Sequence, residues 1–142
     1  IALRTQLEST TGNTSSIAIE DHAGTLRDAG FNDLKEIAMT TANIELDDQH
    51  CGAIIRRTGS STVQVQCQDL TDRYQNGSTT TVINVGTGGT LTIADVAETL
   101  TWLDGSGTLT GKTGDRTLAI GGVATIWRQG ASNYYVWGTG LS

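Results

Sequence analysis

From about residue 39 onward, the chain is a series of short segments in which polar and apolar residues alternate, each followed by Gly, Asp, Asn or Ser. The stretches TTANIELDD (40–48) and STTTVINVG (78–86) show this pattern. Alternation with a period of two places successive side chains on opposite faces of a β-strand. Several such strands between regular turn signals are typical of a β-sandwich or barrel. The sequence therefore predicts an all-β domain.

The turn signals also predict three hairpins. Their turns would lie at residues 59–60, 86–89 and 130–132, where Gly, Ser and Asn cluster. Consecutive hairpins argue for an antiparallel β-sandwich or a jelly-roll-like domain. The predicted strands cover residues 41–46, 51–57, 62–68, 79–85, 90–94, 98–103, 116–120, 122–128 and 133–138.

The first 38 residues differ in character from the rest. Their apolar residues show little clean periodicity, and the polar run TTGNTSS (10–16) interrupts the first pattern. We expect a short, partly helical or extended N-terminal arm over residues 1–38, followed by an antiparallel β-domain over residues 39–142. A chain of 142 residues is long enough to bury a core without metal or disulfide support.

Composition agrees with a β-domain and restricts the partners. The chain has 24 Thr and 18 Gly but no Pro; Thr favours half-exposed strand positions, and Gly supplies turns. The net charge is −6 with 9 Lys and Arg, so we expect no nucleic-acid partner. No apolar run approaches the length of a membrane-spanning helix, and no secretory signal opens the chain. We therefore expect no membrane insertion.

Residues of catalytic or metal-binding type are few. The loop DGSGTLTGKTGD (104–115) looks at first like a phosphate-binding loop, but its glycines have the wrong spacing and a strand is expected after it. The two histidines, His22 and His50, match no catalytic or zinc-binding spacing. We expect a protein that is not an enzyme, with no catalytic residue, no metal site and no cofactor.

The two cysteines, Cys51 and Cys67, would lie opposite each other if residues 51–57 and 62–68 formed a hairpin turning near Gly59. Opposed positions of an antiparallel pair nearly provide the separation that a disulfide requires. Two buried free thiols are the alternative, and a reducing compartment would keep them so. The sequence leaves both possibilities open.

Four of the seven aromatic residues lie in the closing stretch VATIWRQGASNYYVWGTG (123–140), and they suggest either packing or ligand binding. In the predicted hairpin Trp127 approaches Tyr134 or Tyr135, and such cross-strand pairs stabilise a hairpin. Tyr134 and Tyr135 point to opposite faces. We expect packing to dominate, with at least one of Trp127 and Trp137 buried. The alternative is a carbohydrate-binding β-sandwich in which Trp102, Trp127 or Trp137, with the tyrosines nearby, stacks on a sugar of the host surface.

Several stretches resemble a family of small bacteriophage virion proteins and fibre tips. They are LRDAGFN (26–32), LDDQHCGAIIRRTGSSTVQV (46–65) and the ending from VGTGGTLTIAD to WGTGLS (85–142). The resemblance implies a non-enzymatic virion structural protein, a homotrimeric tail-fibre, head-fibre or capsid-decorating component that contacts other virion proteins.

On that resemblance, the arm would attach the protein to the particle through the segment containing Leu26, Arg27 and Phe31. The β-domain would face outward, where host cell-surface glycan is a possible partner. The protein would be located in the virion, after assembly in the host cytoplasm.

Overall fold

The chain divides into two compact units, residues 1–33 and residues 34–142. In the first unit, β1 (Ala18–Glu20) and β2 (Leu26–Asp28) form an antiparallel ladder. All other elements belong to the second unit. The structure is a computed structural model that describes residues 18–20, 26–28, 35–68 and 74–142.

The second unit is built from strands and one short 3-10 helix, so the predicted all-β class is confirmed. Its strands belong to one nine-stranded sheet with the path β3-β5-β7-β10-β8-β6-β4, and β11 and β9 continue from β10. The elements are β3 (Glu36–Met39), β4 (Ile44–Glu45), η1 (Asp48–His50), β5 (Ile54–Arg57), β6 (Val63–Cys67), β7 (Thr79–Asn84), β8 (Leu91–Asp95), β9 (Thr99–Trp102), β10 (Arg116–Arg128) and β11 (Asn133–Leu141).

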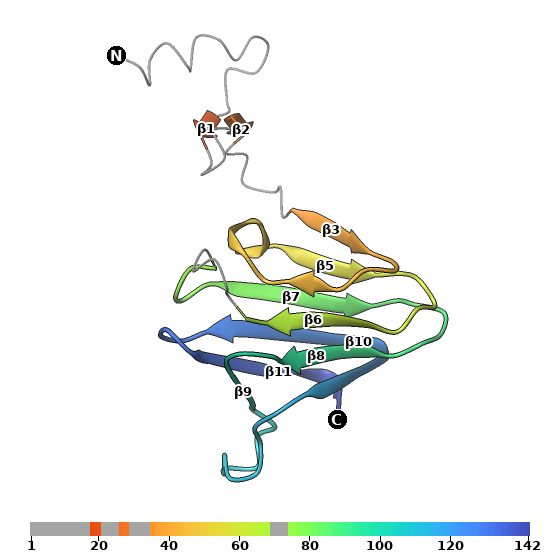
Figure 1. Cartoon of the computed structure of the whole chain (residues 1–142), viewed down its shortest axis with the longest axis vertical. Helices are drawn as coiled ribbons and strands as arrows, with labels where there is room; N and C mark the ends of the chain where they lie inside the picture. Colours follow the sequence, from red (N-terminus) through yellow and green to blue (C-terminus); the bar gives the residue numbers. More distant parts are fainter. Residues whose placement is uncertain (1–17, 21–25, 29–34, 69–73) are drawn as a thin grey trace. The chain divides into compact units, whose positions relative to one another are not determined.

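The sheet folds back on itself into two layers. Strands β3, β5 and β7 pair in parallel in one layer, and β4, β6 and β8 pair in parallel in the other (Figure 1). Strand β10 crosses between the layers: its beginning pairs with β8, and its end pairs with β7. A register shift between Leu118 and Val123 marks the crossing, as expected where a bulge bends a strand.

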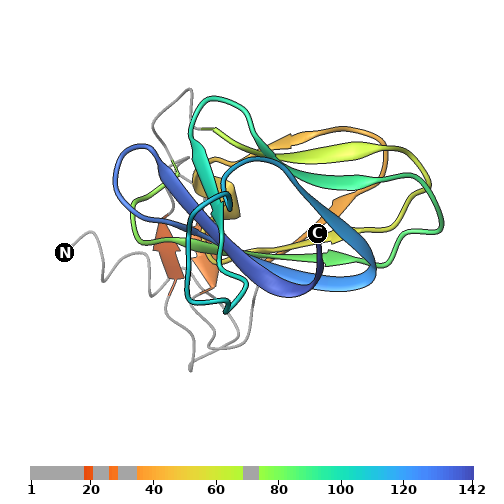
Figure 2. The same ribbon diagram turned by 90° about the horizontal axis from the view of Figure 1, so that it is seen from below.

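Consecutive strands therefore form β-arches, in which the two strands joined by a turn lie in opposite layers. Three arches, β3/β4, β5/β6 and β7/β8, stack on one another, and their turns gather at one end of the domain (Figure 2). Two of the three predicted hairpins are therefore wrong, because β5 does not pair with β6 and β7 does not pair with β8. The third hairpin, β10–β11, is confirmed.

The core lies between the two layers. Alternate residues of each strand point inward, as in Val63, Val65 and Cys67 of β6 or Leu91 and Ile93 of β8, and all of these are buried. Burial of an aliphatic side chain of this size contributes about 1.5–3 kcal/mol. The predicted alternation thus identified the buried face even where the predicted partner strand was wrong.

A polar network fixes the arch ends of the stack. The side chain of Arg57 is fully buried and donates hydrogen bonds to Asn84 Oδ1 at 3.1 Å, to Ser61 O at 2.8 Å and to the carbonyl of Gly88. Asn84 Nδ2 in turn donates to Leu118 O at 2.7 Å. The network joins the second arch, the third arch and β10, so it reinforces the register of their backbone ladders.

The antiparallel pairing that we predicted is wrong for most of the sheet. Five of its ladders are parallel and three are antiparallel. Four of the parallel ladders arise because stacked arches repeat in the same direction, and the fifth joins β9 to β11. Strand β3 also begins at Glu36, inside the range predicted as the arm. It pairs with β5, which the local sequence of residues 36–39 did not indicate.

The stacked arches approach each other closely at Gly89. A Cβ atom at this position would lie 2.3 Å from Ser60 O, and the residue has a φ of +62°. Gly107 offers a matched control: its φ is +78°, but a Cβ atom there would contact nothing within 4 Å.

We expect Gly107→Ala to lower the free energy of unfolding by about 1–2 kcal/mol, the cost of a left-handed conformation for alanine. Gly89→Ala should cost about 3 kcal/mol or more, because the clash with the arch below is added. Denaturant titration of both variants measures the difference. Equal losses would contradict the close stacking of the arches.

Candidate functional site

The β10–β11 hairpin sorts its side chains onto two faces of the sheet. Register pairs Trp127 with Tyr135 and Thr125 with Trp137, and these four residues point outward. Tyr134 and Val136 alternate with them and are fully buried. The predicted opposite placement of Tyr134 and Tyr135 follows this alternation.

The outward side brings three aromatic residues together. The rings of Trp127 and Tyr135 have centroids 5.4 Å apart at an interplanar angle of 31°, which confirms the predicted cross-strand contact. Trp127 and Tyr135 are half-buried, and Trp137 is 37 % exposed. The expectation that at least one of Trp127 and Trp137 would be buried is therefore wrong.

We call the outward side of β7, β10 and β11 the aromatic face. Besides the three aromatics it carries mainly threonines, and sequence analysis had not singled these out. These outward residues occupy every second position of their strands, and the Thr-rich stretches of the sequence do show this spacing. The face comprises Thr79, Thr81, Ile83, Val123, Thr125, Trp127, Tyr135, Trp137 and Thr139.

The inner side of the β10–β11 hairpin packs on the core through a tyrosine, whereas the sequence had led us to expect a buried tryptophan. Tyr134 stacks on Tyr74 with ring centroids 5.9 Å apart and an interplanar angle of 30°. The guanidinium carbon of Arg128 lies 5.9 Å from the centre of the Tyr134 ring. Burial raises the pKa of Tyr74, and its hydroxyl donates to Thr80 Oγ1 at 2.8 Å. This cluster connects the hairpin to β7 and to the chain that follows β6.

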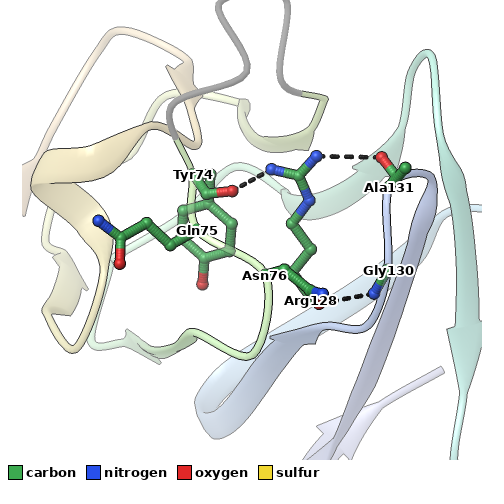
Figure 3. Close-up of a pocket in the computed structure, with 6 residues that line it drawn as sticks. All are labelled: Tyr74, Gln75, Asn76, Arg128, Gly130 and Ala131. Atoms are coloured by element: carbon green, nitrogen blue, oxygen red, sulfur yellow. Dashed lines mark hydrogen bonds between the residues drawn. The ribbon is translucent and has the colours of Figure 1, made fainter.

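A hollow of about 260 Å³ opens beside this cluster (Figure 3). It lies below the usual size range of ligand pockets. Arg128 donates to Tyr74 O and, at 3.0 Å, to Ala131 O. Gly130 N donates to Asn76 Oδ1 at 2.7 Å. These bonds hold the hairpin turn against residues 74–76, so the polar residues that line the hollow have a structural role. Its lining consists of Tyr74, Gln75, Asn76, Arg128, Gly130 and Ala131.

Trp102 lies apart from the other two tryptophans. It is half-buried against the core, on the same face as its register partner Val136. Lys112 Nζ and Arg116 Cζ lie 5.3 Å and 5.4 Å from its ring centre. Lys112 also pairs with Asp104 at 2.5 Å, which holds the pKa of that carboxyl below its usual range. Trp102 thus anchors the Gly-rich loop, the stretch whose glycine spacing argued against a phosphate site.

Cys51 and Cys67 are free thiols in this structure. The geometry that would have opposed them depended on the β5–β6 hairpin, and these strands lie in opposite layers instead. Cys67 is fully buried, and this burial raises the pKa of its thiol. Cys51 is half-buried and lies 3.9 Å from Asp47 O.

His50 has a structural role in the cap of η1. Its Nδ1 accepts a hydrogen bond from Asp47 N at 3.0 Å, and the Asp47 side chain accepts in return from the backbone N–H of His50, which together form a capping box. Gln49 N also donates to Asp47 Oδ1. Burial lowers the pKa of His50, which keeps the ring neutral and able to accept. His22 lies outside the described residues.

The proposed attachment residues are only partly described. Leu26 and Arg27 belong to β2, whereas Phe31 lies outside the described residues. Their role in attachment therefore stays a prediction.

The two faces of the closing hairpin should differ in their effect on stability. We expect Tyr134→Ala to lower the free energy of unfolding by about 3–5 kcal/mol, because it empties a buried site. Trp137→Ala should cost about 1 kcal/mol or less, because the ring is on the surface. Denaturant titration of the two variants tests this, and a larger loss for Trp137→Ala would contradict the assignment of the faces.

The thiols can be tested separately. In a Cys51→Ser variant, we expect Cys67 to react with an aromatic disulfide reagent only after unfolding, since burial disfavours its thiolate. Denatured wild-type protein without reductant should show both thiols. If no thiol of the denatured wild-type protein reacted, the two cysteines would form a disulfide, which would contradict this prediction.

Within the described ranges, none of the helices has the length and hydrophobicity needed to cross a bilayer. The same ranges contain no group of three His, Cys, Asp or Glu placed to hold a metal ion. The chain matches no protein-family model, no curated protein and no solved structure.

Proposed function

We propose that this chain is a non-enzymatic structural protein of a bacteriophage virion, which assembles with copies of itself in a fibre or capsid-decorating component. The proposal starts from the resemblance of residues 26–32, 46–65 and 85–142 to small virion proteins. In this role, the N-terminal segment attaches the protein to other virion proteins, and the β-domain faces outward. Homotrimers are the assembly that the resemblance favours.

The observation that carries the proposal is the open end of the arch stack. Strand β3 pairs with β5, and β4 pairs with β6; within the described part of the chain, neither has a second neighbour. Their unpaired backbone groups form an open edge, which natural proteins normally cover. Neighbouring copies would cover it in a symmetric oligomer. The division of the chain at residue 33 also supports a separate role for the N-terminal segment.

Two further features support a structural role rather than catalysis. His50, the described histidine, is part of a helix cap, and Arg128 holds the hairpin turn. The charged residues Asp104, Lys112 and Arg116 serve the loop that packs on Trp102. These polar side chains of the described residues thus contribute to holding the fold.

A carbohydrate-binding module is the second candidate. The observation that favours it is the grouping of Trp127, Tyr135 and Trp137 on one outward face. The two functions are compatible, since an outward virion domain can also contact host polysaccharide.

We expect the full chain to sediment as an oligomer, most simply a trimer, at micromolar concentration. A variant lacking residues 1–30 should keep the circular-dichroism signal of β-sheet, because the sheet begins at Glu36. It should no longer attach to its particle. A stable monomer of the full chain would contradict the assembly, and loss of the β-sheet signal in the variant would contradict the separate role of the arm.

A further inference from the structure

Within the described residues, the aromatic face brings exposed aromatic rings and hydroxyl groups together. Its rows run across the strands: Thr79, Trp127 and Tyr135 form one row, and Thr81, Thr125 and Trp137 form the next. Strand β9 continues the first row with Thr101, the register partner of Tyr135. The rings of the first row are therefore bordered on both sides by threonines, and Trp137 is bordered on one side.

The face is also free of charge. None of its nine residues has a charged side chain, although the chain as a whole has a net charge of −6. Charges reappear at its border on β5, where Arg56 pairs with Glu36 at 2.6 Å. An anionic ligand would meet no cation on the face and would be repelled by the chain. This argues against nucleic acid and acidic sugars and favours a neutral ligand.

The size of the aromatic face favours a small ligand over a protein partner. Three strands and the five residues of β10 from Val123 to Trp127 span roughly 10 Å by 14 Å. Each partner in a standard protein–protein interface contributes about 800 Å², which is several times this area. A second copy of the chain would need a larger surface, whereas a short oligosaccharide fits.

The chemistry of the two kinds of side chain matches that ligand. The faces of aromatic rings carry partial negative charge, and the C–H groups on one side of a sugar ring carry partial positive charge because each carbon bears an oxygen. The ring hydroxyls of the sugar can exchange hydrogen bonds with threonine side chains such as Thr81 and Thr125. A flat apolar surface with hydroxyls at its border is complementary to a neutral sugar.

We propose that the aromatic face binds a neutral oligosaccharide, with sugar rings stacked on Trp127, Tyr135 and Trp137 and hydrogen-bonded to the neighbouring threonines. The assignment excludes Trp102 and Tyr134, which lie on the inner side of the sheet. It deepens the second candidate function and does not depend on membership of a virion.

A printed array of neutral and acidic oligosaccharides tests the proposal, followed by a tryptophan-fluorescence titration with the neutral oligosaccharide that binds best. We expect neutral glycans to bind. Trp127→Ala and Trp137→Ala should each weaken binding about tenfold or more, as truncation of an aromatic anchor does. Ile120→Ala is the matched control, because Ile120 is 58 % exposed but lies off the aromatic face, and it should leave binding unchanged.

Circular dichroism and sedimentation of each variant complete the experiment. Since Trp137 is on the surface, its variant should remain folded and keep the oligomeric state of the wild type. The proposal is overturned if no array glycan binds, if acidic glycans bind best, or if both tryptophan variants bind as the wild type does. Dissociation of the oligomer by Trp137→Ala would also overturn it, since the face would then join copies of the chain. A monomeric wild type that binds neutral glycans would contradict the virion assembly but support this site.

Discussion

The buried guanidinium of Arg57 links the turns of two stacked arches, whose strands β5 and β7 are also paired through their backbones. It donates to Asn84, Ser61 and Gly88, and Asn84 continues the network to Leu118 on β10. A charge is tolerated in a core only when hydrogen bonds replace its lost water. These acceptors come from two arches and β10, so the hydrogen bonds form together only when the arches stack correctly. A polar contact inside an apolar core thus reinforces the register that the backbone ladders give.

Strand β10 connects the arch stack to the closing hairpin, because it pairs with β8 and β7 of the stack and with β11. Its beginning completes one layer beside β8, and its end completes the other beside β7. The inner residues of the hairpin, with Tyr134 stacked on Tyr74, fix its position. Inner contacts thus hold the hairpin, while on its outer side Trp127 packs on Tyr135 and Trp137 is exposed. A ligand bound to these rings, as proposed above, would rest on a rigid support, which favours precise binding.

The two proposed activities use different surfaces. The open edge lies at β3 and β4, the two ends of the sheet path, whereas the aromatic face lies on β7, β10 and β11. An open edge offers backbone hydrogen bonds along a strand, which suits another copy of the chain. The aromatic face offers ring faces and hydroxyls over a small area, which suits a sugar. Assembly and glycan binding can therefore vary independently.

The sequence alone determined where most strands after residue 40 lie and which of their residues point inward, because alternation is a local property of the chain; it did not reveal β3. It also identified the β10–β11 hairpin and the contact of Trp127 with Tyr135, because residues close in sequence make them. It could not distinguish a hairpin from an arch at Gly59, since strand–turn–strand sequences look alike whether the strands bond to each other or face each other. Only the tertiary structure decided this, through contacts such as Arg57 to Asn84 between residues far apart in the chain. The same long-range pairing placed β5 and β6 in different layers, which removed the hairpin that would have opposed Cys51 and Cys67, and left the tryptophans of the closing hairpin on its outer side.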